Sequence, residues 1–136
     1  MDTIFTASGL LVLPFWFLMI FLPKWGFTRK VIGSALIVVP AALLYIGLVL
    51  PRIHTILPAV VIPELSEISR LLATPEGTTI AWAHFLTFDL FVGRWVYLES
   101  RERDLSVWLM APVLFFVLML GPLGLLLYFA VRGRQA

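Results

Sequence analysis

Residues 81–103, AWAHFLTFDLFVGRWVYLESRER, decide how the whole chain is interpreted. The stretch has the length and apolar content of a membrane-spanning helix, yet ionisable side chains are spaced along it, among them His84, Asp89, Arg94 and Glu99. The other three long apolar stretches have no ionisable residue except tyrosine in their interiors. Ionisable groups inside a membrane are costly and usually mark functional sites, so any chemistry is expected on this helix.

The free energy of inserting this helix into lipid explains why its polar groups need partners. Asp89 and Arg94 each cost about 2.5 to 3.5 kcal/mol at the centre of a helix, whereas each strongly apolar residue contributes only roughly 0.3 to 0.6 kcal/mol. The apolar residues of the stretch do not clearly outweigh that cost. The helix is therefore stable in a membrane only if its polar groups face other helices or a wet cavity.

Helical geometry distributes these groups over two faces. One face carries the histidine and an aromatic stripe, with the arginine and the glutamate on its flanks: His84, Phe88, Phe91, Trp95, Arg94 and Glu99. The opposite face carries the aspartate: Trp82, Leu86, Asp89, Gly93 and Val96. Asp89 and Arg94 are five positions apart, so they are not expected to pair as side chains four positions apart would.

Composition places the chain among polytopic membrane proteins. Of its 136 residues, 61% are hydrophobic and 13% are charged, and the mean hydropathy is +1.02. The formal charge of +2 comes from Lys and Arg scattered at helix ends, where they suit anionic lipid headgroups and do not form a nucleic-acid patch. The absence of cysteine excludes disulfides, thiolate metal sites and iron–sulfur clusters.

The expected fold class is all-α: a single integral membrane domain, residues 1–136, with four transmembrane helices. The expected spans are residues 4–22, 31–50, 80–98 and 106–132. Proline lies inside the first, second and fourth spans but not in the polar third span, so bent helices are expected around a straight one. Four crossings put both termini on one side of the membrane. The small difference in the number of basic residues between the loops favours an orientation in which both termini face away from the cytoplasm.

The longest connection, residues 51–79, separates the second and third spans. Its first part, residues 53–63, is too short to cross a membrane and is expected to be re-entrant or interfacial. A short amphipathic interfacial helix is expected over residues 64–73, because a proline and two acidic residues open it. The first apolar run begins at Ile4 without a basic segment before it, so it is interpreted as a retained span and not as a signal peptide.

Two strings in the second half of the chain point to a family. They are AHFLTFDLFVGRWVYLESRER at residues 83–103 and GPLGLLLYFAVR at residues 121–132. They resemble the membrane family of the plant abscisic-acid-deficient-four protein, which is neoxanthin-synthase-like, and its bacterial relatives. The resemblance is densest over residues 82–132, and the first two spans match mainly in hydropathy. Because no transit peptide is visible, the chain is expected to be a bacterial-type member.

The resemblance implies the isomerisation of an epoxy-carotenoid to an allenic alcohol. Such a reaction is redox-neutral: an acid opens the epoxide and a base removes a vinylic proton. Under this hypothesis Asp89 is the acid, His84 is the base, and Arg94 holds a ring hydroxyl or tunes Asp89. The expected ligand-binding residues form an aromatic groove for the polyene: Trp82, Phe85, Phe88, Phe91 and Trp95.

Each of these residues also has a structural interpretation. His84 can bond a carbonyl or a headgroup near the membrane surface, Asp89 can bond across helices, and Arg94 can extend toward water. The aromatic stripe can pack against helices or lipid. The two histidines lack the spacing of a transition-metal site, and no metal site is expected. A third alternative makes His84 an axial ligand of chlorophyll magnesium or haem iron.

Two functions follow from this sequence. The first is a carotenoid- or xanthophyll-interacting integral membrane protein, with isomerase activity as a further step. The alternative is a noncatalytic small subunit or assembly factor of a photosynthetic pigment–protein complex. The expected partners are the lipid bilayer, a carotenoid or chlorophyll, and copies of this chain or other subunits, with no required cofactor and no nucleic acid. The expected location is a bacterial inner, intracytoplasmic or thylakoid membrane.

Overall fold

The computed structural model describes residues 1–135, and every regular element among them is helical. The first half of the chain forms α1 (Asp2–Phe21), α2 (Gly26–Ile32), the 3-10 helix η1 (Ala35–Val38), α3 (Val39–Val49), η2 (Leu50–Arg52), α4 (Ile53–Val61) and α5 (Leu65–Leu72). The second half forms α6 (Pro75–Glu102), α7 (Val107–Met119) and α8 (Gly121–Gln135). The expected all-α fold class is confirmed for the described residues.

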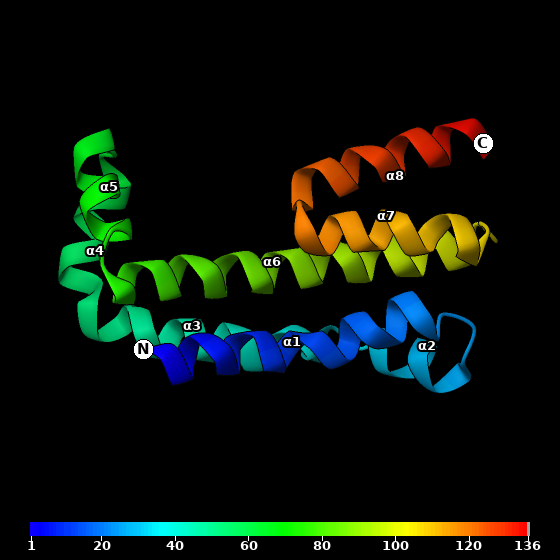
Figure 1. Ribbon diagram of the computed structural model, residues 1–136, viewed down its shortest axis with the longest axis horizontal. Coiled ribbons are helices and arrows are strands. Elements are labelled where there is room, and N and C mark those ends of the chain that lie inside the picture. Colours follow the sequence, from blue (N-terminus) through cyan, green and yellow to red (C-terminus); the bar gives the residue numbers. More distant parts are fainter. Residues whose placement is uncertain (136) are drawn as a thin grey trace.

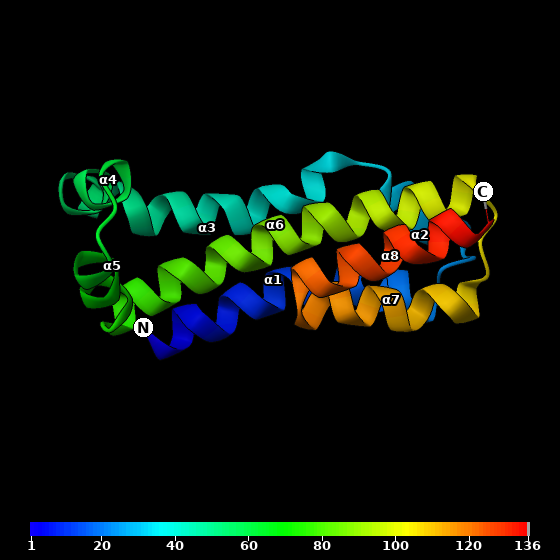
Figure 2. The ribbon, with the colours of Figure 1, turned by 90° about the horizontal axis from the view of Figure 1, so that it is seen from above.

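The long helix α6 is the centre of the molecule (Figure 1). Its first turn is well defined, because the hydroxyl of Thr74 accepts a hydrogen bond from the amide of Gly77 at 2.9 Å and Pro75 occupies the first helical position. With 28 residues it is about 42 Å long. α1, α3 and α7 all pack against α6, and α1 and α7 also contact each other, so α6 contacts nearly every other helix (Figures 1 and 2).

The α1–α6 interface depends on a glycine. A Cβ atom at Gly93 would lie 2.3 Å from Cη2 of Trp16, so only glycine lets the buried indole lie against the α6 backbone. Leu86 and Val96 are buried on the same face. Helical geometry places Gly93, Leu86 and Val96 on one face, and the structure shows that this face packs against α1.

The predicted fourth span, residues 106–132, is wrong as a single helix. Helix α7 ends at Met119, Leu120 leaves the helical conformation, and α8 begins at Gly121. The two helices fold back on each other as a hairpin (Figure 1). Gly124 permits the close approach, since a Cβ atom there would lie 2.2 Å from the backbone nitrogen of Val117. The paired Gly121 and Pro122 reverse the chain instead of bending one helix.

The hairpin also changes where the chain ends. The C-terminal end of α8 returns to the end of the molecule where α6 finishes, whereas the N-terminus lies near the start of α6 (Figures 1 and 2). The expectation that both termini lie on one side is therefore wrong for this structure. The error follows directly from counting α7 and α8 as one crossing.

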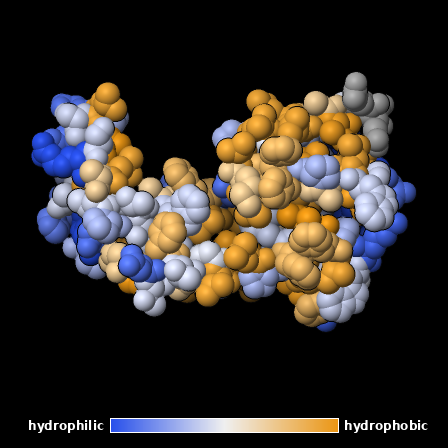
Figure 3. Space-filling view, in the orientation of Figure 1, coloured by the Kyte–Doolittle hydropathy of each residue, from blue (hydrophilic) through white to orange (hydrophobic). Residues whose placement is uncertain are grey.

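Two helical stretches are long and apolar enough to cross a membrane, Asp2–Phe21 and Ala35–Val61, and α7 is a shorter apolar helix. The second stretch begins and ends later than the predicted span over residues 31–50. The short helix expected over residues 64–73 is confirmed as α5, and its position at a membrane surface stays a prediction. Hydrophobic side chains cover much of the visible surface, with a hollow above α6 between α5 and the α7–α8 hairpin (Figure 3).

Candidate functional site

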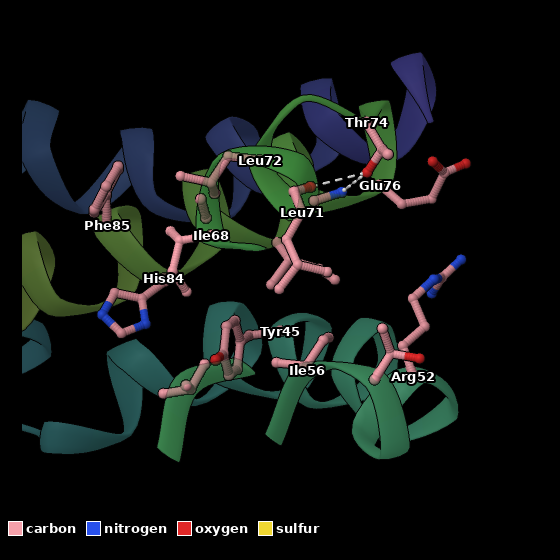
Figure 4. Close-up of a pocket in the computed structure, with 15 residues that line it drawn as sticks. Tyr45, Arg52, Ile56, Ile68, Leu71, Leu72, Thr74, Glu76, His84 and Phe85 are labelled. Carbon is pink, nitrogen blue, oxygen red and sulfur yellow. Dashed lines mark hydrogen bonds between the residues drawn. The ribbon is translucent and has the colours of Figure 1, made fainter. Parts of the chain in front are cut away.

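A cavity of about 500 Å³ lies where α3, α4 and α5 meet the first half of α6 (Figure 4). Its volume is in the range of small-molecule sites, and its walls are mainly apolar. The lining residues come from four helices and the 3-10 helix η2: Tyr45, Arg52, Thr55, Ile56, Val60, Ile68, Leu71, Leu72, Thr74, Glu76, Gly77, Ile80, Ala81, His84 and Phe85.

His84 lies at one end of this cavity and Tyr45 of α3 faces it (Figure 4). Their ring centroids are 5.7 Å apart in an edge-on arrangement, and the ring of Phe88 lies 4.9 Å from the imidazole on the other side. The structure gives no hydrogen bond to the His84 side chain within residues 1–135. The imidazole is held by aromatic contacts, and both of its nitrogens remain available to a ligand.

Polar groups gather at the opposite end of the cavity. Arg52 and Glu76 lie there, with the apolar side chains of Ile56, Ile68 and Leu71 between them and His84 (Figure 4). Arg52 donates a hydrogen bond from Nη1 to the carbonyl of Leu48 at 2.9 Å, which leaves its other guanidinium donors free of protein bonds in the described chain. The cavity therefore has two polar ends separated by an apolar middle.

Sequence reasoning found only His84 and Phe85 among the residues that line this cavity. Tyr45, Arg52 and Glu76 were missed because they lie in other segments, and nothing local connects them to residue 84. One signal was present: Tyr45 is the one ionisable residue in the interior of the predicted second span. An isolated phenol in an apolar helix usually has a polar or aromatic partner, which here is His84.

Asp89 lies elsewhere, against the first residue of α8. A Cβ atom at Gly121 would be only 2.4 Å from Oδ1 of Asp89, so the carboxyl group touches the tip of the hairpin. Asp89 does not line the cavity that contains His84. The structure therefore does not bring the predicted acid and base together, and a catalytic role for either residue stays a prediction.

Arg94 bonds to the end of another helix. Its Nε donates to the carbonyl of Ile32 at 2.8 Å, and its Nη2 donates to the carbonyl of Gly33 at 2.7 Å. These carbonyls end α2, where a cation is favoured by the helix dipole. No ion pair joins Arg94 to Asp89 in the described part of the chain. The expected roles of Arg94, holding a ligand hydroxyl or tuning Asp89, stay predictions, and its observed bonds are structural.

The predicted aromatic groove separates into two groups. Phe85 lines the cavity and Phe88 adjoins His84, while Phe91 is 47% exposed further along α6. Trp82 stacks on Phe5 of α1 with ring centroids 5.4 Å apart, and Trp95 contacts the ring of Tyr128 in α8 at 5.6 Å. The two tryptophans thus pack helices together, and the phenylalanines form the exposed part of the stripe.

Across residues 1–135, no group of three His, Asp or Glu side chains comes close enough to hold a metal ion. A single axial imidazole from His84 does not require such a group, and that alternative stays a prediction.

The fold and the cavity define an all-helical, strongly apolar protein that has a ligand-sized cavity beside a histidine. The chain belongs to the ABA4-like family, because the ABA DEFICIENT 4-like family model matches residues 3–128. This confirms the family that the strings at residues 83–103 and 121–132 indicated.

One relative shows how far sequences have diverged within the family. Protein ABA DEFICIENT 4, chloroplastic, from Arabidopsis thaliana is 26% identical to this chain over 138 residues, which cover 97% of this chain. The match covers 61% of the relative, so this chain spans about three-fifths of that protein's length. No solved structure matches the chain.

Proposed function

We propose that this chain is an integral membrane protein that binds a carotenoid or xanthophyll through the cavity beside His84. The membrane placement is supported by the two long apolar helices and by the apolar surface (Figure 3). In this arrangement α1, the Ala35–Val61 stretch and α6 cross the bilayer. α7 has 13 residues and is about 20 Å long, shorter than a hydrocarbon core of about 30 Å, so α7 and α8 form a re-entrant hairpin.

The cavity suits one end of a long apolar molecule. About 500 Å³ accommodates a substituted ring, and the polar groups of Arg52 and Glu76 can bond a ring hydroxyl. The remaining chain of the ligand would leave the cavity past Phe85 and continue over Phe88 and Phe91, which are 56%, 57% and 47% exposed. An exposed aromatic stripe beside a mainly apolar cavity with polar groups at its ends is the single observation that carries this proposal.

The proposed reaction is the isomerisation of an epoxide end group, and it uses groups that face the same cavity. A proton donor gives a proton to the epoxide oxygen as its carbon–oxygen bond breaks, and His84 takes a proton from the polyene carbon. The electrons of that carbon–hydrogen bond form the new double bond, so no oxidant is needed. Tyr45 is the donor nearest to His84 in the cavity, and Asp89 could act only on a part of the ligand that reaches the tip of α8.

Purification in a mild detergent tests the binding step. The purified full chain is expected to carry, or to take up, a carotenoid that absorbs in the visible range. His84→Leu is expected to lower pigment occupancy at least fivefold, whereas the matched control His54→Gln changes the other histidine, which does not line the cavity. Equal occupancy in both variants, or no pigment in the wild type, would contradict the proposal.

Catalysis and complex formation need separate measurements. Incubation with an epoxy-xanthophyll, followed by chromatography, is expected to give an isomer of unchanged mass in the wild type and not in His84→Leu. The mass of the purified particle tests the alternative function. Stoichiometric recovery inside a large pigment–protein complex, without any isomer formed, would favour the noncatalytic subunit or assembly factor.

A further inference from the structure

A second cavity, of about 590 Å³, lies at the other end of the molecule between the end of α1 and the start of α7. Its wall is mainly apolar and includes Phe21 of α1 and Ala111 of α7. Its lining also includes Lys24, Trp25 and Trp108, and among the described residues Lys24 is the only charged one that lines it. The proposed pigment site uses none of these residues.

The rim of this cavity is held by hydrogen bonds to α6. The hydroxyl of Tyr97 donates to the carbonyl of Pro23 at 2.7 Å, which fixes the turn that precedes Lys24. On the other side, the amide of Leu105 donates to the carbonyl of Ser100 at 3.0 Å, and the guanidinium of Arg101 donates to the carbonyl of Leu105. The two turns therefore keep a fixed spacing, and the opening between α1 and α7 is part of the fold.

Two exposed indoles indicate where this cavity would lie relative to the membrane surface. Trp25 is 52% exposed and Trp108 is 86% exposed, one on each side of the cavity. Tryptophan concentrates at the level of lipid headgroups, because its ring is apolar and its N–H is polar. If the chain crosses a membrane as proposed, Lys24 lies at the headgroup level, and the apolar wall lies below it at the level of the acyl chains.

We propose that this cavity binds an anionic phospholipid, with its phosphate group on Lys24 and an acyl chain between Phe21 and Ala111. The charge of the rim supports an anion, since Lys24 has no ion-pair partner in the part of the chain that the structure describes. The inference depends on the membrane placement and not on the pigment site, so each can fail without the other.

Lipid-dependent thermal stability of the detergent-purified full chain tests this inference. Phosphatidylglycerol is expected to raise the unfolding temperature in a saturable way, while phosphatidylcholine of the same chain length and inorganic phosphate leave it nearly unchanged. Lys24→Gln is expected to weaken the apparent affinity about fivefold. Lys30→Gln is the matched control, because it removes a basic residue that does not line the cavity.

A second variant tests the apolar half of the site. Ala111→Trp fills the space beside Phe21 without changing any charge, and it is expected to reduce phosphatidylglycerol binding as measured by native mass spectrometry. Equal responses to the two lipids, or equal losses in Lys24→Gln and Lys30→Gln, would overturn the proposal. So would a response to inorganic phosphate alone, because it would assign the site to a free anion.

Discussion

The two halves of α6 differ in how their long polar side chains are bonded to the rest of the protein. In the second half, four polar side chains form hydrogen bonds with other elements or adjacent turns: Arg94, Tyr97, Glu99 and Arg101. In the first half, the His84 side chain makes no hydrogen bond within residues 1–135; it contacts the rings of Tyr45 and Phe88 and lines a cavity. A polar group whose bonds are already used by the protein holds the fold together, whereas one without such bonds is available to a ligand. Function is therefore expected in the first half of α6.

The two ends of α6 also differ in charge, which predicts how the molecule lies in a membrane. The end reached by the hairpin is rich in basic residues: Lys24, Arg29, Lys30, Arg101, Arg103 and Arg132. The other end carries an excess of acidic ones: Asp2, Glu64, Glu67 and Glu76, against Arg52 and Arg70. Because basic residues favour the cytoplasmic side, the start of α6 and the N-terminus are expected outside.

Cysteine labelling gives an all-or-none measurement of this orientation, because the described chain has no cysteine of its own. In bacterial spheroplasts that express the chain, a membrane-impermeant maleimide is expected to label Ser66→Cys in α5. Glu102→Cys, at the end of α6, is expected to react only after the membrane is permeabilised. The reverse pattern, or equal labelling of both variants, would contradict a fold in which the hairpin returns to the basic end.

The next largest effect is expected for a substitution in the α7–α8 hairpin, which packs against the second half of α6. Gly124→Ala places a methyl group 2.2 Å from a backbone atom of Val117, and backbone cannot move aside as a flexible side chain can. We expect a loss of about 3 kcal/mol in the free energy of unfolding, measured by denaturant titration in detergent. Gly47→Ala is the matched control, because nothing lies within 4 Å of its new methyl group. It is expected to be neutral or stabilising by up to about 1 kcal/mol.

Substitutions of Arg94 and His84 compare the two halves of α6 directly, because they are expected to change the free energy of unfolding by different amounts. Arg94→Leu leaves the carbonyls of Ile32 and Gly33 without their donor, and we expect a loss of about 2 to 3 kcal/mol in stability. His84→Leu removes no hydrogen bond and is expected to change stability by about 0.5 kcal/mol or less. If the two variants lose equal stability, or if Arg94→Leu alone abolishes pigment binding in a folded protein, the division between structural and functional halves is wrong.

Local patterns in the sequence were enough to predict that α6 is a helix. The predicted span over residues 80–98 lies within α6, which extends beyond it at both ends, and the separation of Asp89 from His84 follows from a period of 3.6 residues. The family was also identified from two strings in the second half of the chain. These features depend on neighbours along one helix, which a sequence displays directly.

The features that were missed depend on contacts between distant segments. Gly121 and Pro122 are compatible with either a kink or a reversal, and the choice depends on how α7 packs on α8 and α6. Arg94 finds its carbonyls 61 and 62 residues earlier, in a helix too short to be expected from its composition. The cavity likewise joins α3, α4 and α5 to α6, so Arg52 and Glu76 could not be connected with His84 beforehand.

The smallest expected effect concerns Glu99, which follows the predicted span at residues 80–98. Its carboxylate accepts a hydrogen bond from Nη1 of Arg132 at 2.9 Å and so ties α8 to α6. Burial by itself raises the pKa of Glu99, but the hydrogen bond and the positive charges of Arg132 and Arg103 outweigh it and hold the pKa below its usual value. The pair is partly exposed to solvent, so Glu99→Gln is expected to cost less than about 1 kcal/mol at neutral pH.

The free energy of unfolding measured at acidic pH distinguishes an ion pair at Glu99 from a packing contact. Since the pKa of Glu99 is lower in the folded state, its contribution is present above the usual glutamate pKa and is lost as the pH falls through the folded value. The difference in unfolding free energy between wild type and Glu99→Gln should therefore shrink on acidification. The control Glu102→Gln removes a carboxylate at the same end of the helix that has no ion-pair partner among the described residues, so the difference should be near zero at every pH. A constant difference for Glu99→Gln would mean that the link between α6 and α8 depends on shape and not on charge.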